Sequence, residues 1–254
     1  MCKMRKRERA AHVTSVRGIG AVVAACAMAA LVSSCSAAVG GTARPTTGIT
    51  PRPVIGSTIE QALLDRAELA KVLDLSIKAL QPPRLGGSKK LFHIVAPGPN
   101  ECLGVLAELQ SISYQSADVQ DVAWESWLDA KTNPAVVIAV DEGVVALPTA
   151  VEADALFATF AQQWNRCNGK TADYRSQSYR ITDVRLTDSV LAATVQTSPA
   201  PIARAIGIRV NCVVEVKVPL SRDDGPSQAG GSADPETRAI DIARLMMDKV
   251  SKLS

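Results

Sequence analysis

The sequence predicts an α+β fold, in which helices cover a central, mostly antiparallel sheet. Apolar and polar residues alternate from Ile206 to Val218, which is typical of a strand with one buried face. Residues 150–166 and 235–250 carry apolar side chains at helical spacing, so each predicts an amphipathic helix. Shorter apolar runs rich in β-branched residues supply further strands. These patterns together favour a sheet meander packed against helices.

The remaining elements follow from local signals. Asp65 and Glu68 have the spacing of a capping box and predict a helix through Leu73, after a shorter helical stretch at 57–60. Thr149 caps the helix 150–166. A further helix is expected at 103–109, and strands at 91–95, 122–128, 135–140, 180–186 and 190–197. Breaks are expected at 81–83 and 85–87, and a loop at 222–234.

The N-terminus resembles a bacterial lipoprotein signal. A basic stretch is followed by an uncharged apolar segment, 19–32, which is shorter than the about 20 residues of a membrane-spanning helix. Small residues then precede Cys35, a pattern similar to a lipobox. We therefore expect a signal peptide at 1–34, cleavage between Ser34 and Cys35, and acyl chains on Cys35. An ordinary signal peptide with an incidental cysteine is the alternative, and either Met1 or Met4 is the start.

Composition then separates a tether from a domain. Residues 35–57 are rich in Gly, Pro and Thr without a period and predict a flexible tether, whereas 58–254 hold the folded domain. Beyond residue 34 the chain has 22 basic and 24 acidic residues, so the electrostatic basis for a nucleic-acid partner is missing. The aromatic share of 4% also argues against a base-stacking surface. The expected attachment is to the membrane, through acyl chains on Cys35.

Three cysteines remain in the predicted domain. Cys212 is in phase with the apolar strand face and is expected to be a buried, free thiol. Cys102 opens one predicted helix and Cys167 closes another, so a disulfide between them is favoured. A bridge between Cys167 and Cys212 is the alternative.

Residue types that carry catalysis or bind metals are scarce. His93 is the one histidine beyond the signal and is expected to be structural, and no zinc-ligand spacing, phosphate loop or Gly-x-Ser-x-Gly elbow accompanies it. Four acidic residues form a cluster in the sequence: Asp118, Asp121, Glu125 and Asp129. We expect them to lie on a solvated strand face and its loop, and the alternative is an acid/base pair or a cation site. We expect no enzyme activity, catalytic residue, cofactor or metal, and a hydrolase that uses the acidic cluster is a minor alternative.

The two tryptophans of the predicted strand 122–128 are candidates for a binding surface. Trp124 and Trp127 are three residues apart, so their side chains face opposite sides of the sheet. One is expected in the core, and the other is a candidate to line a cleft or a partner surface.

Several short motifs resemble the PknH-like extracellular sensor domain of mycobacteria over about residues 57–253. They are Leu63-Leu64, Glu68-Leu69, Glu101-Cys102, Tyr114, Trp164–Cys167, Val213–Val216 and the Ala-rich final helix. The sharpest are the early Glu-Cys and the Trp-x-x-Cys that follows it. The kinase form of this domain has a second disulfide, and the partner that Cys212 would need for it is missing here. No kinase motif is present.

The resemblance implies a mixed fold with a central sheet, a deep cleft for an unidentified ligand, and a position outside the cytoplasm. We therefore expect a lipid-anchored lipoprotein of the cell envelope with a non-catalytic sensor or ligand-binding domain. Its partners would be an unknown small or envelope-derived ligand, or a membrane protein. A carrier of lipid or another apolar molecule is the alternative.

Overall fold

The computed structural model describes residues 51–254, except 94–99, 130–138, 175–176, 199 and 220–234. The predicted signal peptide, the lipid site at Cys35, most of the tether and the loop 222–234 therefore lie outside the described residues. The described elements belong to one compact unit, Thr50–Ser254. None of its described helices is long and apolar enough to cross a membrane.

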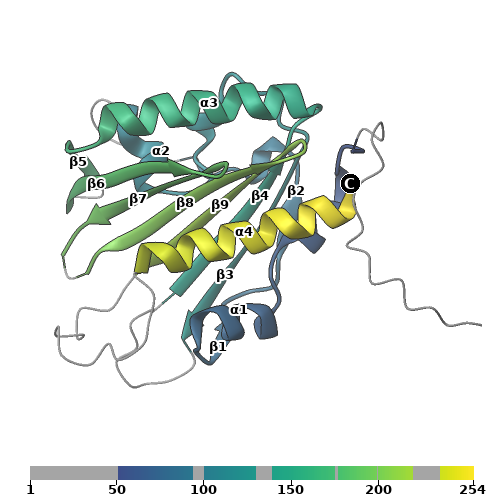
Figure 1. Cartoon of the computed structure of the whole chain (residues 1–254), viewed down its shortest axis with the longest axis horizontal. Helices are drawn as coiled ribbons and strands as arrows, with labels where there is room; N and C mark the ends of the chain where they lie inside the picture. Colours follow the sequence, from purple (N-terminus) through teal and green to yellow (C-terminus); the bar gives the residue numbers. More distant parts are fainter. Residues whose placement is uncertain (1–50, 94–99, 130–138, 175–176, 199, 220–234) are drawn as a thin grey trace, which may run out of the picture. The chain divides into compact units, whose positions relative to one another are not determined.

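The centre of the unit is a nine-stranded sheet whose pairings are all antiparallel (Figure 1). Its order is β1-β3-β4-β9-β8-β7-β6-β5, and β2 also pairs with β3. The strands are β1 (Ile77–Ala79), β2 (Arg84–Gly86), β3 (Asp121–Asp129), β4 (Ala139–Ala146), β5 (Thr171–Tyr174), β6 (Gln177–Thr187), β7 (Val190–Gln196), β8 (Ile202–Arg209) and β9 (Cys212–Pro219).

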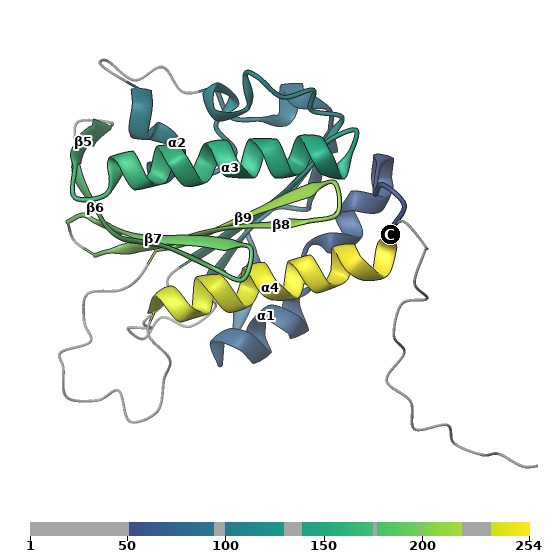
Figure 2. The same cartoon turned by 45° about the horizontal axis from the view of Figure 1, so that its top comes forward.

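Helices cover both faces of this sheet, so the predicted α+β class is confirmed. The two long helices, α3 (Ala150–Cys167) and α4 (Pro235–Leu253), lie on opposite faces (Figure 2). The shorter α-helices are α1 (Arg66–Leu73) and α2 (Leu103–Leu106). Four 3-10 helices complete the set: η1 (Gly56–Ala62), η2 (Ser88–Lys90), η3 (Asn100–Cys102) and η4 (Ser111–Tyr114).

The caps expected at Asp65 and Thr149 form as predicted, whereas η1 begins at Gly56 without a side-chain cap. The Asp65 carboxylate accepts hydrogen bonds from the backbone N–H groups of Ala67 and Glu68, and the Glu68 side chain accepts from the Asp65 N–H. The Thr149 hydroxyl accepts from the Glu152 N–H at the start of α3. These bonds satisfy donors that a helix leaves unpaired at its first turn, which fixes where α1 and α3 begin.

Each face of the sheet has its own apolar core. Residues of α1, η1 and α4 pack on one face with Val214 and Val216 of β9. Residues of α2 and α3 pack on the other face with Val213 of the same strand. The central strands are thus buried on both sides, rather than on one side as the alternating pattern predicted.

The predicted single strand 206–218 is wrong, because the chain reverses within it. Arg209 pairs with Cys212 across a two-residue turn, Val210-Asn211, which joins β8 to β9. Such a turn preserves the alternation along the sequence but exchanges the faces, so Ile206 packs under α3 and Val214 under α4. Val210 has a φ of 53° although it is β-branched, and the absence of Gly concealed the turn.

Other elements also differ from the prediction. Residues 91–95 were expected to form a strand, but Phe92 makes one isolated bridge to Gln110. The helix expected at 103–109 ends at Leu106. The break expected at 81–83 lies between β1 and β2, whereas β2 runs through most of the break expected at 85–87. Both strands pair with the longer strand β3. Such short edge strands depend on a partner that lies far away in sequence, so local patterns did not predict them.

The packed chain begins before residue 58, where the domain was expected to start. The Asn211 side chain pairs with both backbone groups of Val54: its Oδ1 accepts from the Val54 N–H (2.8 Å) and its Nδ2 donates to the Val54 carbonyl (3.0 Å). Nδ2 also donates to the Leu147 carbonyl (2.7 Å). Asn211 thereby holds the entering chain at the turn between β8 and β9.

Candidate functional site

A cleft of about 670 Å³ opens at one end of the sheet. This end is where β5 finishes and where β6 and β8 begin, at Tyr174, Gln177 and Ile202 respectively. The volume is in the range of small-molecule sites. The lining residues are Phe92, His93, Leu106, Ala107, Glu108, Gln110, Tyr174, Gln177, Tyr179, Ile202 and Lys217. The segment 102–110, which we call the cleft wall, supplies four of them.

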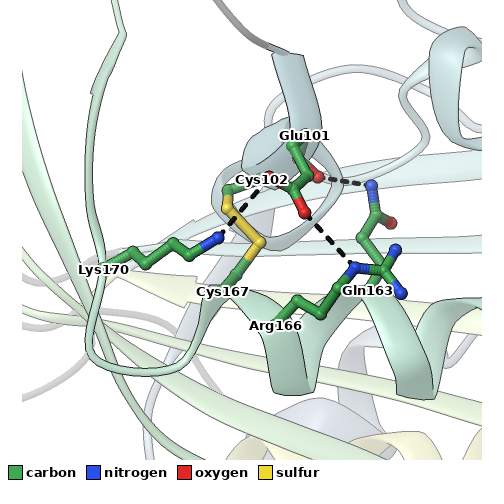
Figure 3. Close-up of a disulfide and its surroundings, with 6 residues drawn as sticks. All are labelled: Glu101, Cys102, Gln163, Arg166, Cys167 and Lys170. Atoms are coloured by element: carbon green, nitrogen blue, oxygen red, sulfur yellow. Dashed lines mark hydrogen bonds and ion pairs between the residues drawn. A yellow bond between two sulfur atoms is a disulfide. The ribbon is translucent and has the colours of Figure 1, made fainter.

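A disulfide fixes the start of this wall to the end of α3. Cys102 is bonded to Cys167, 65 residues further along the chain, so the favoured pairing is confirmed. The Glu101 carboxylate accepts from Arg166 Nε (3.3 Å) and forms an ion pair with Lys170 Nζ (3.5 Å) beside the bridge (Figure 3). The Glu101 carbonyl accepts from the Gln163 side chain. The first residue of the wall is therefore joined to α3 by a covalent bond, and the preceding Glu101 is joined to α3 by a hydrogen bond.

A completely buried arginine holds the wall to the sheet. Arg204 of β8 donates from Nε to the Val105 carbonyl (3.0 Å) and from Nη2 to the Gly104 carbonyl (3.3 Å). Nη2 also donates to Glu215 Oε2 at 2.9 Å. The second oxygen of Glu215, Oε1, accepts from the Tyr114 hydroxyl (2.6 Å) and the Leu109 N–H (3.1 Å). The pair links β8, β9, η4 and the wall.

The charged contacts continue from the core into the cleft. Glu108 Oε2 is 3.4 Å from Lys217 Nζ, and Lys217 Nζ is 3.1 Å from Asp141 Oδ2. Burial lowers the pKa of Lys217, but the neighbouring Glu108 and Asp141 carboxylates outweigh it, so the pKa is raised and the ammonium is retained. Burial raises the pKa of Glu215 although Arg204 opposes this. Sequence reasoning did not select Arg204, which stands in an apolar run of β8.

Two side-chain oxygens of the wall have no hydrogen-bond partner among the described residues. Gln110 is 1% exposed, and its Nε2 donates to the Glu108 carbonyl (2.9 Å), so the orientation of the amide is fixed. The Gln110 Oε1 is consequently a buried acceptor without a donor. Glu108 Oε2 is likewise buried, with ion-pair contacts but no hydrogen bond in the described part of the chain. Buried acceptors of this kind are uncommon in folded proteins.

The two candidate tryptophans lie on opposite faces of β3. Trp127 is buried in the α4 core, where its Nε1 donates to Glu142 Oε1 (3.0 Å). Trp124 is half-buried and packs edge-to-face on Phe92, with ring centroids 4.9 Å apart. Trp124 therefore packs against Phe92, which lines the cleft, but Trp124 is not itself a lining residue.

His93 and Cys212 occupy very different environments. His93 is exposed at the cleft, where its Nδ1 is 2.9 Å from Ser111 Oγ, rather than inside a strand. Cys212 is a buried free thiol against the α4 core. Burial, with a further contribution from Asp121, raises the pKa of Cys212 to about 12, so the thiol stays protonated and unreactive.

The acidic cluster departs at Glu125 from the solvated strand face that was expected, and the side chain of Asp129 lies outside the described part of the chain. Glu125 is 6% exposed and lies opposite Glu142, a buried carboxylate that sequence patterns did not select. Burial and the nearby Glu60 raise the pKa of Glu125 to about 7, and burial raises that of Glu142 to about 8. Asp118 is exposed elsewhere, beside a smaller hollow, and Asp121 accepts from the Gly56 N–H. Across the described part of the chain, no group of three or more His, Cys, Asp or Glu side chains is placed to hold a metal ion.

Comparisons with known proteins agree with this architecture. A family model described as the PknH-like extracellular domain matches residues 54–249 and thus begins at Val54, the first residue held by Asn211. The crystal structure of the extracellular domain of PknH from Mycobacterium tuberculosis is similar, with a TM-score of 0.63 and 21% identity. The match covers 80% of this chain and 100% of that chain, and at this identity it shows a shared fold. No curated protein matches the chain.

The family match covers well over half of the chain, and the family is one of extracellular domains, which indicates a place outside the cytoplasm. The structural match supports the same fold independently. The chain therefore belongs to the PknH-like extracellular domain family.

Proposed function

We propose that this chain is a non-catalytic sensor-type lipoprotein, held on the outer face of the membrane by acyl chains on Cys35, which binds a small polar ligand in the cleft. The observation that carries the proposal is the construction of the cleft wall. A disulfide at Cys102 and two hydrogen bonds from Arg204, to the carbonyls of Gly104 and Val105, hold a wall that has buried, unsatisfied acceptors. A fixed wall of this kind favours binding, because the site loses little conformational entropy when it is filled.

The chemistry of the lining supports binding more than catalysis. Glu108 and Lys217 are engaged with one another, and Lys217 is also engaged with Asp141. Ser111 and His93 are in contact, but no described hydrogen bond joins the His93 ring to a carboxylate that would orient it as a base.

The polarity of the cleft also favours a polar ligand over an acyl chain. A carrier of apolar molecules needs an enclosed apolar cavity, whereas Glu108 and Lys217 line this one. An acyl chain placed over them would remove water from two charged groups without supplying hydrogen bonds, which is costly.

Native mass spectrometry of residues 36–254, secreted by a mycobacterial host and purified without detergent, tests the proposal. Gln177→Trp fills the cleft from an exposed lining position, and Ala155→Trp is the matched control in the smaller hollow beside α3. A stoichiometric polar adduct that Gln177→Trp loses and Ala155→Trp keeps supports ligand binding in the cleft.

The other outcomes identify what is wrong. An adduct that survives Gln177→Trp places the ligand elsewhere, and an adduct with the mass of a lipid favours the carrier. A protein recovered without any adduct contradicts a stably bound small ligand and directs the search to a membrane protein partner by crosslinking.

A further inference from the structure

We infer that the ligand of the cleft carries a primary ammonium group, which binds at Glu108 and Gln110 of the cleft wall. This inference rests on the proposed ligand-binding function and adds the chemical class of the ligand. Three separate features of the described residues support it: the unsatisfied acceptors, the balance of charge, and the aromatic side chains of the lining.

The unsatisfied polar atoms of the wall are both oxygens. Gln110 Oε1 must accept, because Nε2 of the same amide already donates to the Glu108 carbonyl. Glu108 Oε2 has the ammonium of Lys217 at 3.4 Å and the guanidinium of Arg204 at 3.9 Å, yet no hydrogen bond. A ligand that satisfies this wall must therefore donate, and an ammonium group supplies three donors where a hydroxyl supplies one.

Among the described residues, the connected charges around the wall have a negative excess. Two cations, Arg204 and Lys217, contact three carboxylates, Glu108, Asp141 and Glu215. Glu215 is ionised in this arrangement, because Arg204, Tyr114 and the Leu109 N–H all donate to its oxygens. Of the three carboxylates, Glu108 is the one that lines the cleft, and its side chain is 12% exposed. A cationic ligand group would balance this charge.

An anionic ligand does not fit the same residues. Among the described lining residues, Lys217 is the one with a permanent positive charge, and its ammonium already has carboxylates at 3.1 and 3.4 Å. A phosphate or carboxylate beside it would also stand near Glu108 and Asp141, and like charges at such distances repel strongly in a partly buried site.

Three aromatic side chains line the cleft together with the wall: Phe92, Tyr174 and Tyr179. Tyr174 and Tyr179 have ring centroids 6.1 Å apart, and Phe92 is held in place by Trp124. Faces of aromatic rings attract cations, which adds about 0.5–2 kcal/mol for each favourable contact. The cleft therefore combines acceptors, negative charge and aromatic surface, each of which favours an ammonium group.

The test is a protein-observed NMR titration of the chain without its signal, with two pairs of small probes. Each pair differs by one ammonium group: benzylammonium against benzyl alcohol, and glucosamine against glucose. We expect chemical-shift changes at the backbone amides of Phe92 and Ala107. The ammonium probe of each pair should bind about tenfold more tightly than its hydroxyl partner, because it forms a charge-assisted hydrogen bond.

Two variants assign the effect to the wall. Glu108→Gln removes the charge and retains the shape, and should reduce the affinity for benzylammonium to that for benzyl alcohol. Gln110→Leu should weaken ammonium binding about fivefold, since it removes one acceptor. Glu152→Gln, at the smaller hollow, is the control and should leave both affinities unchanged.

Two results overturn the inference. If the ammonium probe and its hydroxyl partner bind the cleft with equal affinity, the ligand does not need an ammonium group. The proposed ligand-binding cleft is supported by the same result. The absence of cleft shifts with all four probes rejects the ammonium class too, and the proposed function then depends on the native mass spectrum alone.

Discussion

Arg204 and Glu215 form an ion pair of 2.9 Å that is completely enclosed between the sheet and the cleft wall. Every polar atom of the Glu215 carboxylate has a donor, from Arg204, Tyr114 or the Leu109 backbone. The Arg204 guanidinium also donates hydrogen bonds to the carbonyls of Gly104, Val105 and Val216. The buried ion pair thus holds the cleft wall in place, because both of its members are hydrogen-bonded to backbone groups of the wall.

Loss of one member of this pair should destabilise the fold strongly. Arg204→Met leaves Glu215 buried and without its counter-charge, and we expect the free energy of unfolding to fall by about 3–5 kcal/mol. Urea denaturation measures the change. The double variant Arg204→Met/Glu215→Leu should recover a large part of the loss, because no unpaired charge remains. A single variant within about 1 kcal/mol of the natural protein would contradict the structural role.

The buried carboxyls of the α4 core predict a loss of stability as the pH rises. The pKa values of Glu125 and Glu142 are raised to about 7 and about 8, so the folded protein keeps protons that the unfolded chain, with carboxyl pKa values near 4.5, releases. Their contribution to stability is therefore complete below pH 4.5 and decreases as the pH rises through 7 and 8.

Glu142→Gln tests this dependence, because a neutral amide cannot lose the proton. We expect the natural protein to lose at least about 2 kcal/mol more than the variant between pH 4.5 and 8. Urea denaturation along a pH series gives the two slopes. Asp118→Asn, at an exposed acidic residue, is the control and should keep the natural slope. Parallel curves for Glu142→Gln and the natural protein would refute the buried proton.

Removal of the disulfide should loosen the cleft wall before the rest of the fold. Cys102→Ala/Cys167→Ala opens a loop of 65 residues, which costs about 4 kcal/mol in the chain-entropy model. We expect faster hydrogen exchange at 103–110 than in α4, which packs on the opposite face of the sheet. Equal acceleration in both segments would mean that the bridge stabilises the whole domain rather than the wall.

The amide of Asn211 should determine how firmly the first residues of the domain are held. Asn211→Ala removes three buried hydrogen bonds, two to Val54 and one to the Leu147 carbonyl, so we expect a loss of about 2–3 kcal/mol. The exchange rate of the Val54 N–H should rise most. Asn168→Ala, at the exposed end of α3, serves as the comparison and should change neither quantity.

The proposed membrane attachment through Cys35 gives a prediction that is independent of the fold. Cys35→Ala should move the protein from the membrane fraction to the soluble fraction, because acyl chains contribute about 0.8 kcal/mol for each methylene buried in lipid. Fractionation and immunoblotting of the mycobacterial host measure the change, with Cys212→Ala as the matched cysteine control. Retention of Cys35→Ala in the membrane fraction would rule out the lipid anchor.

Local sequence patterns predicted the elements that depend on local interactions. The caps at Asp65 and Thr149 act within one helical turn, and the stripes of α3 and α4 repeat over several turns. The disulfide could be favoured for a similar reason, since both cysteines lie at helix ends. Chain reversal at Val210-Asn211 was hidden, because a two-residue turn leaves the alternation of residue types intact.

The cleft wall depended on contacts that a single sequence does not reveal. Arg204 and Glu108 are about a hundred residues apart, and Gln110 is polar like many exposed loop residues. Only packing on both faces of the sheet turns Glu215 and Glu142 into buried groups. The useful signal would have been the presence of opposite charges, Arg204 and Glu215, within two strongly apolar strands of one hairpin.

The position of Asn211 has a mechanical consequence. Val54 is bound at the turn after β8, whereas Ile202, at the first residue of that strand, lines the cleft. An eight-residue strand separates the two points by about 25 Å. A pull on the chain from residues before Val54 therefore loads the turn and the α4 core first, and the cross-linked wall, at the far end, keeps its shape under tension.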